Sequence, residues 1–259
     1  MLLPRVLTAL VGIPLLLFLI HWGGLTFCLF IVGISALSLY EYGVVLAMGN
    51  RPCQRINVIL CGAALAACAA LEGPLGLVAS ATVTWVMLRE MFNREHSLDR
   101  AALTLFGAFF LGWMPAHLAL IRELRPDGEK LAFMLFVSVW AMDTAAYAAG
   151  KSFGRHKLAE GLSPKKTWEG AVAGFAAAMA VVMIFKAANS GMLSLLSALM
   201  VGALIGVSGQ LSDLAESLVK RAVGAKDSGA LLPGHGGVMD RFDSFILAAP
   251  VVYYFLVFR

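Results

Sequence analysis

Charged residues are scarce in this sequence. Asp, Glu, Lys and Arg together make up 14% of its 259 residues, whereas a soluble globular domain carries roughly 25%. Hydrophobic residues account for 60% of the chain. A chain of this length cannot hide so much apolar surface inside one core, because its surface is too large relative to its volume. The composition therefore excludes an ordinary soluble domain and predicts a protein that lies in a lipid bilayer.

Cysteine pairs, cleavage signals and nucleic-acid-binding stretches are also lacking. The four cysteines form no CxxC motif, which predicts small packing residues and not a disulfide or a metal site: Cys28, Cys53, Cys61 and Cys68. No small-x-small cleavage site follows the apolar run 6–20, so we expect a retained first helix and not a signal peptide. No basic-aromatic stretch accompanies the net charge of +4, so the basic residues indicate cytoplasmic loops and not nucleic acid as a partner.

Nine apolar segments have about the 20-residue length that a membrane-spanning helix needs. They cover residues 4–22, 25–42, 56–72, 75–92, 101–121, 131–150, 170–188, 192–212 and 242–258. Only three residues, 72–74, separate the third segment from the fourth, so eight spans are the alternative. The sequence predicts an all-α polytopic membrane protein that forms a single integral membrane domain over residues 1–259.

Ionisable residues begin to interrupt the apolar segments at Asp143. Asp143, Tyr147 and Lys151 share one helix face, because they are spaced four residues apart. Ionisable side chains inside a membrane are costly and usually functional. Two interpretations stay open: an interfacial aspartate paired with Lys151, or a polar stripe that faces a site at the cytoplasmic end of the bundle.

The segment 163–170, Ser-Pro-Lys-Lys-Thr-Trp-Glu-Gly, directly precedes an apolar run. Ser163 and Pro164 predict a helix start, with serine as the N-cap and proline at the first helical position. A helix N-terminus beside Lys165 and Lys166 is favourable for binding an anion. The alternative is a basic anchor that flanks the membrane.

An amphipathic helix is predicted around residues 211–221. Asp213, Ser217 and Lys220 recur at helical spacing on one face, and Lys220 and Arg221 give the helix a basic end. A surface helix with this pattern is common, so the stripe alone is weak evidence for a site.

The loop after this helix is rich in glycine, with Gly234, Gly236 and Gly237 around His235. Glycines let backbone N–H groups approach an anion closely. Two carboxylates, Asp240 and Asp243, follow one helical turn apart, and carboxylates beside basic groups suit a divalent metal that bridges phosphate oxygens. The alternative is a glycine-rich turn with charges at the membrane interface.

Residues 217–243 resemble the signature of the phosphatidate cytidylyltransferase (CDP-diacylglycerol synthase) family. All of its fixed positions are filled across 27 residues: Ser217, Lys220, Arg221, Lys226, Asp227, Gly229, Leu232, Pro233, His235, Gly236, Gly237, Asp240, Arg241 and Asp243. Segments 140–147 and 163–170 also resemble the family, although Ala145 stands where relatives often carry glycine. The resemblance implies a helical scaffold over 1–139 and a catalytic part over 140–259.

This resemblance implies a nucleotidyltransferase of phospholipid biosynthesis, which makes CDP-diacylglycerol and pyrophosphate from CTP and phosphatidate. The lipid phosphate attacks the α-phosphorus of CTP in line, and catalysis is mostly positioning and charge neutralisation. Mg²⁺ is the implied cofactor, and a second cation is left open. The partners are CTP, phosphatidate and the bilayer, with a homo-oligomer left open. The expected location is the bacterial inner membrane, with the N-terminus and the active site cytoplasmic.

We assign roles to individual residues on the same basis. The Mg²⁺ ligands are Asp213 and Asp240, and the catalytic residues are Asp213, Asp240, Lys226 and Asp243. The substrate-binding residues are Asp143, Ser163, Lys165, Lys166, Ser217, Lys220, Arg221, His235, Gly236, Gly237 and Arg241.

Two other classes fit less well. An ion-coupled or proton-coupled transporter would explain acidic residues near helix ends, but not the Lys/Arg-rich and Gly-rich loop, and no inverted repeat is present. A CDP-alcohol phosphotransferase would carry the motif Asp-x2-Asp-Gly-x2-Ala-Arg, which is absent.

The basic residues generate a topology prediction. With a cytoplasmic N-terminus and nine spans, 15 of the 20 Lys and Arg residues fall on the cytoplasmic side, as such residues usually do. We expect a reporter fused after Arg259 to be external and one inserted in 151–169 to be cytoplasmic. A cytoplasmic C-terminus would show that the spans are miscounted, in the first instance within 56–92.

Overall fold

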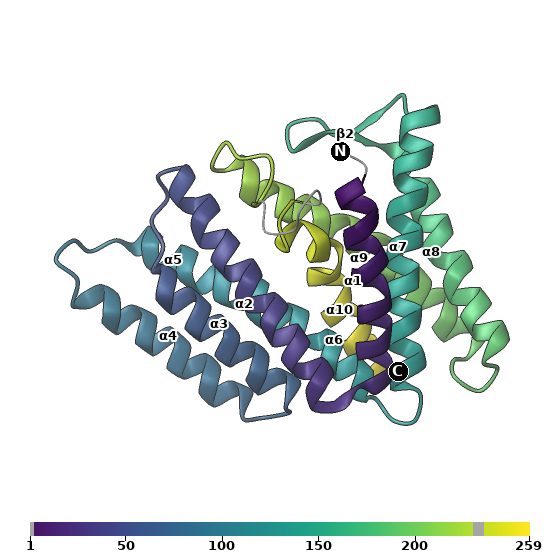
Figure 1. Cartoon of the computed structure of the whole chain (residues 1–259), viewed down its shortest axis with the longest axis horizontal. Coiled ribbons are helices and arrows are strands. Elements are labelled where there is room, and N and C mark those ends of the chain that lie inside the picture. Colours follow the sequence, from purple (N-terminus) through teal and green to yellow (C-terminus); the bar gives the residue numbers. More distant parts are fainter. Residues whose placement is uncertain (1–2, 230–235) are drawn as a thin grey trace. The chain divides into compact units, whose positions relative to one another are not determined.

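The computed structural model describes residues 3–229 and 236–259, with side chains from residue 10 onward. This part of the chain is largely helical (Figure 1). Its helices are α1 (Leu3–Trp22), α2 (Gly24–Met48), α3 (Arg55–Ala70), α4 (Leu75–Met91), α5 (Leu98–Gly107), η1 (Ala108–Trp113), α6 (Met114–Glu123), α7 (Gly128–Phe153), α8 (Trp168–Ala188), α9 (Leu195–Arg221) and α10 (Met239–Phe258). Two short strands, β1 (Lys157–Ala159) and β2 (Ser163–Thr167), form a hairpin.

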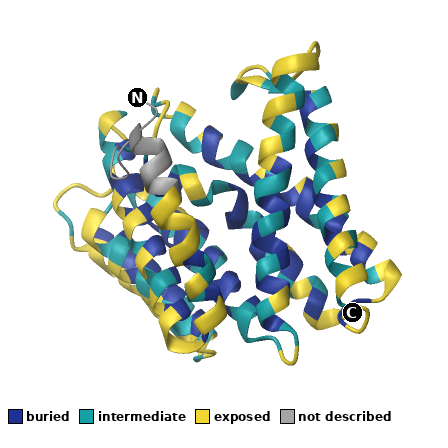
Figure 2. Cartoon of the chain, turned by 45° about the vertical axis from the view of Figure 1, so that its right-hand side comes forward, coloured by how far each residue is buried: buried dark blue, intermediate teal, exposed yellow. Residues whose placement is uncertain are grey.

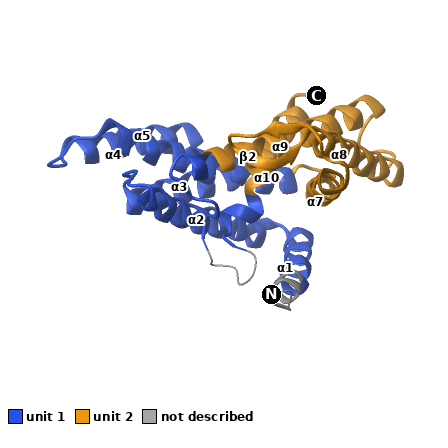
Figure 3. Cartoon of the chain, turned by 90° about the horizontal axis from the view of Figure 1, so that it is seen from above, with its two compact units in different colours: residues 1–123, 219–242 blue, residues 124–218, 243–259 orange. Residues whose placement is uncertain are grey.

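The chain divides into two compact units (Figure 3). Unit 1 contains residues 1–123 and 219–242, and unit 2 contains residues 124–218 and 243–259. Helices α9 and α10 each belong to both units, since the boundaries fall inside them. The single membrane domain, with a scaffold before residue 140 and a catalytic part after it, stays a prediction.

Each of the nine predicted apolar segments overlaps helical structure. Among the described residues, six stretches are long and apolar enough to cross a membrane: Gly24–Met48, Leu98–Glu123, Gly128–Phe153, Trp168–Ala188, Leu195–Arg221 and Met239–Phe258. Helices α3 and α4 have only 16 and 17 residues. The predicted class of a helical, multi-pass membrane protein agrees with this structure, whereas the number of spans stays a prediction.

Helix α8 shows how apolar residues are distributed in unit 2. It buries only Gly170, Gly174, Ala178 and Val182, which form one stripe along the helix. Large apolar side chains on its other faces, such as Val172 and Ile184, are exposed. Figure 2 colours the ribbon of the chain by how far each residue is buried. A helix that is apolar all round and exposed on most sides is suited to lipid and not to water.

Glycines bring α7 and α8 close together within unit 2. A Cβ atom at Gly170 would lie 2.6 Å from the carbonyl oxygen of Ala146, and one at Gly174 would lie 2.9 Å from that of Met142. Both distances are too short for a side chain. In a bilayer the hydrophobic effect does not drive helices together, because lipid is as apolar as their side chains. Small residues at a crossing let the two backbones come close, so that van der Waals packing stabilises the pair.

The predicted helix start at Ser163 and Pro164 is wrong. These residues belong to β2, which pairs antiparallel with β1. The helix begins later, and its N-cap is Thr167, whose hydroxyl accepts a hydrogen bond from the Gly170 N–H at 3.2 Å. Threonine is a good N-cap and lies next to the apolar run, so the hairpin can use the residues before it.

Unit 1 packs α3 against the helical stretch formed by α5, η1 and α6. The middle of this stretch, η1, is a π-helix. A Cβ at Gly112 in η1 would lie 2.5 Å from the carbonyl oxygen of Gly62 in α3. Nearby, the Tyr42 hydroxyl of α2 donates to the carbonyl oxygen of Leu103 at 2.8 Å. The wider π turn thus lies where two backbones meet.

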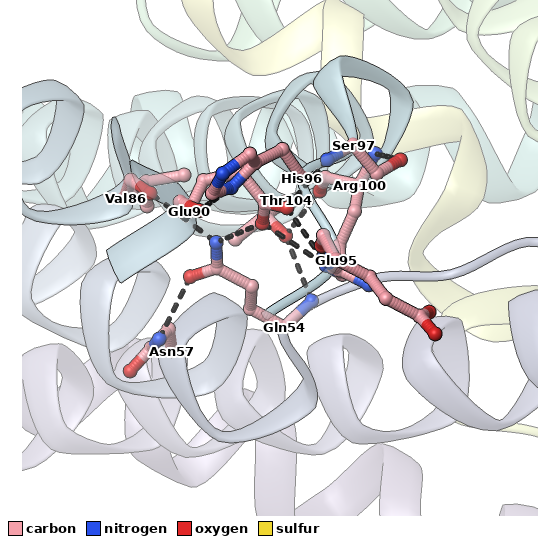
Figure 4. Close-up of polar contacts among 9 residues, drawn as sticks. All are labelled: Gln54, Asn57, Val86, Glu90, Glu95, His96, Ser97, Arg100 and Thr104. Atoms are coloured by element: carbon pink, nitrogen blue, oxygen red, sulfur yellow. Dashed lines mark hydrogen bonds and ion pairs between the residues drawn. The ribbon is translucent and has the colours of Figure 1, made fainter. Parts of the chain in front are cut away.

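A buried carboxylate, Glu90, joins α3, α4 and α5 within unit 1 (Figure 4). Its oxygens accept from Arg100 Nε at 3.0 Å and Nη2 at 2.5 Å, in a two-pronged ion pair. They also accept from the Ser97 N–H at 2.7 Å and from Gln54 Nε2 at 3.0 Å. Gln54 is the residue before α3 and Ser97 is the N-cap of α5, so one carboxylate fixes two helix starts.

We expect Glu90→Gln to lower the free energy of unfolding by on the order of 3 kcal/mol, because Arg100 would lose its buried counter-charge. Thermal unfolding of the purified protein in detergent measures the change. Glu95→Gln is the matched control, since the Glu95 side chain is exposed and the hydrogen bond to Arg100 comes from its backbone carbonyl, which the change keeps. Equal stability of the two variants would contradict a stabilising role for this pair.

Candidate active site

Carboxylates gather in unit 2 from three helices. Asp143 comes from α7, Asp213 and Glu216 come from α9, and Asp243 comes from α10. We call these four residues the carboxylate cluster. Asp243 lies within electrostatic reach of the other three, so the negative charges of the cluster act on one another. The sequence predicted three of these four residues as site residues, on separate segments, and the fold of unit 2 brings them together.

A lysine balances part of this charge. Lys166 of β2 places its Nζ 2.7 Å from Oδ2 of Asp213, and both side chains are partly exposed. Ser217 lies one turn further along α9, with its hydroxyl 3.5 Å from Asp213 Oδ1. The structure thus brings together three predicted site residues from the hairpin and from α9, whereas the anion-binding role of this segment stays a prediction.

Two serines hold the helices of the carboxylate cluster in place. The Ser244 hydroxyl of α10 lies 3.3 and 3.4 Å from the two oxygens of Asp143. The Ser212 hydroxyl of α9 donates to the backbone carbonyl of Asp243 and accepts from the Leu247 N–H at 3.0 Å. Both serines are buried. Sequence reasoning missed them, although each lies directly beside a predicted aspartate.

The stripe Asp143, Tyr147 and Lys151 lies on α7, as predicted. Lys151 Nζ lies 5.9 Å from the centre of the Tyr147 ring, in a cation–π arrangement. Asp143 contacts Ser244 of the carboxylate cluster. Asp143 itself is exposed, and both interpretations of this stripe stay predictions.

In unit 1, Asp240 is the centre of a second polar group. Its Oδ1 lies 2.7 Å from Lys220 Nζ. Its Oδ2 accepts from the Ser228 N–H at 3.0 Å, from the Ser228 hydroxyl at 2.9 Å and from the Gly237 N–H at 3.1 Å. Gly236 has φ +84°, a conformation that favours glycine. Asp240 therefore connects Ser228 and Gly237 as well as pairing with a lysine.

Other predicted residues of this loop face outward. Lys226 and Arg241 are exposed, and so is Lys165 in the hairpin of unit 2. Arg221 Nη1 donates to the carbonyl oxygen of Ala225 at 2.9 Å, which fixes the turn after α9. Ser163 lies in β2 and is half-buried. His235 lies outside the described residues.

Glu41 is a residue of this region that sequence reasoning missed. It lies in α2, is 2% exposed, and accepts from the backbone N–H groups of Val238 and Met239. A signal was present, because Glu41 is the only charged residue in the 25 residues of α2. Ionisable residues in apolar spans mark functional positions by default.

The described residues contain no group of three or more His, Cys, Asp or Glu side chains close enough to hold one metal ion. Mg²⁺, however, is commonly bound through one or two carboxylates together with substrate phosphates. The oxygen donors Asp213 and Asp240 have this chemistry, and each pairs with a lysine in its own unit. Each of these two carboxylates by itself offers the kind of oxygen ligand that Mg²⁺ takes, and the assignment of Mg²⁺ to them stays a prediction.

The chain is similar over its whole length to proteins of one family. The model of the cytidylyltransferase family matches residues 3–259. A phosphatidate cytidylyltransferase from Brucella suis is 36% identical over 258 residues, covering 97% of this chain and 92% of that protein. One from Synechocystis sp. is 30% identical, covering 98% and 96%. One from Bacillus subtilis is 36% identical over 166 residues, covering 64% and 62%.

These matches extend well beyond the segments that first carried the resemblance, since they include the helices before residue 140. They confirm the predicted relationship and set aside the transporter and the CDP-alcohol phosphotransferase as alternatives. The chain belongs to the cytidylyltransferase family.

Proposed function

We propose that this protein is a phosphatidate cytidylyltransferase, which converts CTP and phosphatidate to CDP-diacylglycerol and pyrophosphate. The observation that carries the proposal is the match of nearly the whole chain to proteins of that name. The apolar helices supply a membrane location for the lipid substrate, and the polar loops supply basic groups for the nucleotide.

The reaction places clear demands on the residues. An oxygen of the lipid phosphate attacks the α-phosphorus of CTP, the bond to the β-phosphate oxygen breaks, and pyrophosphate leaves. The attacking oxygen is already anionic, so no strong general base is needed. The main requirement is to bring several negative charges together, and positioning with charge neutralisation meets it.

Basic side chains supply part of that neutralisation. Lys166 and Lys220 each pair with an aspartate in the structure, which holds their ammonium groups in defined positions. Lys226 and Arg241 are exposed and therefore accessible to a nucleotide from solution. We assign phosphate binding to these residues, together with Lys165, Arg221, Ser163, Ser217, His235 and the amides of Gly236 and Gly237.

Mg²⁺ is the proposed cofactor, with Asp213 and Asp240 as ligands and with Asp143 and Asp243 contributing. When bound, Mg²⁺ neutralises charge on phosphate oxygens. In this proposal, the carboxylates of this chain would hold the ion at the membrane surface. We propose that this surface is the cytoplasmic one. The bacterial sources of the relatives agree with an inner-membrane location.

Purified protein in mixed micelles with phosphatidate, Mg²⁺ and radiolabelled CTP tests the proposal. We expect label to enter the lipid fraction while pyrophosphate is released in equal amount. A preparation that is folded by its unfolding transition, but incorporates no label, would refute the activity.

Asp213→Asn and Asp240→Asn should each lower the turnover number by at least about 100-fold, because each removes a carboxylate charge that a doubly charged ion needs. Turnover is measured over a range of Mg²⁺ concentrations, and unfolding transitions check that both variants are folded. Asp99→Asn is the control, since Asp99 is exposed and belongs neither to the carboxylate cluster nor to the polar group around Asp240. Near-normal turnover of both variants at low Mg²⁺ would disprove the ligand assignment.

CTP and dCTP should both be substrates, because no residue of this chain is an evident reader of the 2′-hydroxyl, whereas UTP and ATP should be poor. Lys226→Ala and Lys166→Ala should weaken all nucleotides alike, because these side chains are assigned to phosphate and not to the base. Competition assays with the four nucleotides measure both effects. Lys186→Ala, at the far end of α8, is the control.

Selective rescue of UTP by either lysine change would mean that the residue contacts the base. Since Lys166 also pairs with Asp213, Lys226→Ala is the cleaner of the two tests.

A further inference from the structure

Glu41 is an unusual residue for a long apolar helix. Helix α2 spans 25 residues, and Glu41 is the only one that carries a charge. Its side chain is 2% exposed, so the carboxylate is removed from solvent. A carboxylate in such surroundings is costly unless hydrogen-bond donors compensate it. The donors that surround Glu41 therefore indicate what it does.

Both oxygens of Glu41 accept backbone hydrogen bonds from the start of α10. The Val238 N–H donates to Oε1 at 2.9 Å, and the Met239 N–H donates to Oε2 at 2.8 Å. Met239 is the first residue of α10 and Val238 directly precedes it, and N–H groups at a helix start have no partners within the helix. Glu41 thus caps α10 from a position 197 residues earlier in the chain, and its negative charge is favourable at a helix N-terminus.

A third contact links Glu41 to the residues around Asp240. The Ser228 hydroxyl lies 3.2 Å from Glu41 Oε2 and 2.9 Å from Asp240 Oδ2. Its single proton can be donated to either carboxylate. Asp240 begins the same helix that Glu41 caps, so Glu41 and Asp240 hold one backbone segment from two sides.

The glycines of the loop are shaped around the Glu41 side chain. A Cβ at Gly237 would lie 1.9 Å from the Ser228 hydroxyl and 2.5 Å from Glu41 Oε2. A Cβ at Gly229 would lie 3.1 Å from Glu41 Oε1. The first distances leave no room for any side chain at Gly237. Residues 229 and 237 therefore lie close to this carboxylate, and the approach at Gly237 requires a glycine.

We infer that Glu41 is a positioning residue for the reaction. It holds residues 228–229 and 236–239 in the conformation in which Asp240 faces Lys220 and the Gly237 amide. This inference rests on the proposed function, because Asp240 is a proposed Mg²⁺ ligand. Groups that orient a metal ligand are worth roughly 10–100-fold in metal affinity or activity.

Glu41→Gln keeps the size of the side chain but turns one acceptor oxygen into an amide donor. The backbone N–H groups of Val238 and Met239 would then lose one of their two acceptors. We expect amide hydrogen exchange in 236–241 to be about 10-fold faster or more, measured without nucleotide or metal. We also expect the Mg²⁺ concentration for half-maximal activity to rise about 10-fold, with a lower turnover number.

Glu90→Gln is the matched control, because it removes another buried carboxylate of unit 1 that lies outside both polar groups. It should lower thermal stability without changing exchange in 236–241 or the Mg²⁺ dependence. Glu41→Asp keeps the charge on a side chain shorter by one methylene. Its amide exchange in 236–241 and its Mg²⁺ dependence should lie between those of the wild type and of Glu41→Gln. If Glu41→Gln does not fold, Glu41→Asp is the test variant.

Wild-type exchange in 236–241 after Glu41→Gln would overturn the inference. So would faster exchange with unchanged Mg²⁺ dependence and turnover, because Glu41 would then stabilise the fold alone. Failure of the wild-type protein to label lipid would instead refute the proposed function. The exchange experiment would still report whether Glu41 holds the start of α10.

Discussion

The cost of placing charge among apolar residues governs the polar structure of this chain. Glu41 and Glu90 are both buried, and each has donors for both carboxylate oxygens. Their partners are of different kinds. Glu90 accepts from a guanidinium, a side-chain amide and one backbone N–H, whereas Glu41 accepts from two backbone N–H groups and a hydroxyl and has no cationic partner among these donors. In each case the compensation joins segments that lie far apart in sequence, so the buried charge also specifies how those segments meet.

Buried serine hydroxyls also join segments that lie far apart in sequence, and burying a hydroxyl costs less free energy than burying a charge. Ser228 lies between Glu41 and Asp240 in unit 1, and Ser212 and Ser244 connect α9, α10 and α7 in unit 2. A serine is small enough to sit between packed helices and can both donate and accept. These residues carry no charge to attract substrate. Ser228 and Ser244 contact aspartate carboxylates directly, whereas Ser212 joins backbone groups of α10 to α9.

The two units contribute different chemistry to the proposed reaction. Unit 2 gathers four carboxylates and the basic hairpin, with Lys166 already against Asp213. Unit 1 holds the glycine-rich loop, where Lys220 and backbone amides converge on Asp240. Each unit by itself pairs an aspartate with a lysine. The membrane-embedded helices that carry them are suited to a lipid substrate, and the exposed Lys226 and Arg241 to a nucleotide from solution.

The sequence by itself determined that the protein is helical and multi-pass, which segments are largely helical, and the family. These follow from local information: runs of apolar residues of spanning length, and a signature of contiguous residues over 217–243. It also predicted the aspartates and lysines of both polar groups. The prediction of a helix start at Ser163 was wrong, because pairing with β1 supplies the backbone hydrogen bonds that a helix would otherwise supply.

The tertiary structure alone decided which distant residues meet. Glu41 precedes Val238 and Met239 by nearly two hundred residues, and no periodicity or motif connects them. The same holds for Ser244 with Asp143 and for Lys166 with Asp213. Such contacts depend on how helices pack. Packing is determined by the shapes of many side chains together, and so it cannot be read from the spacing of residues along one segment.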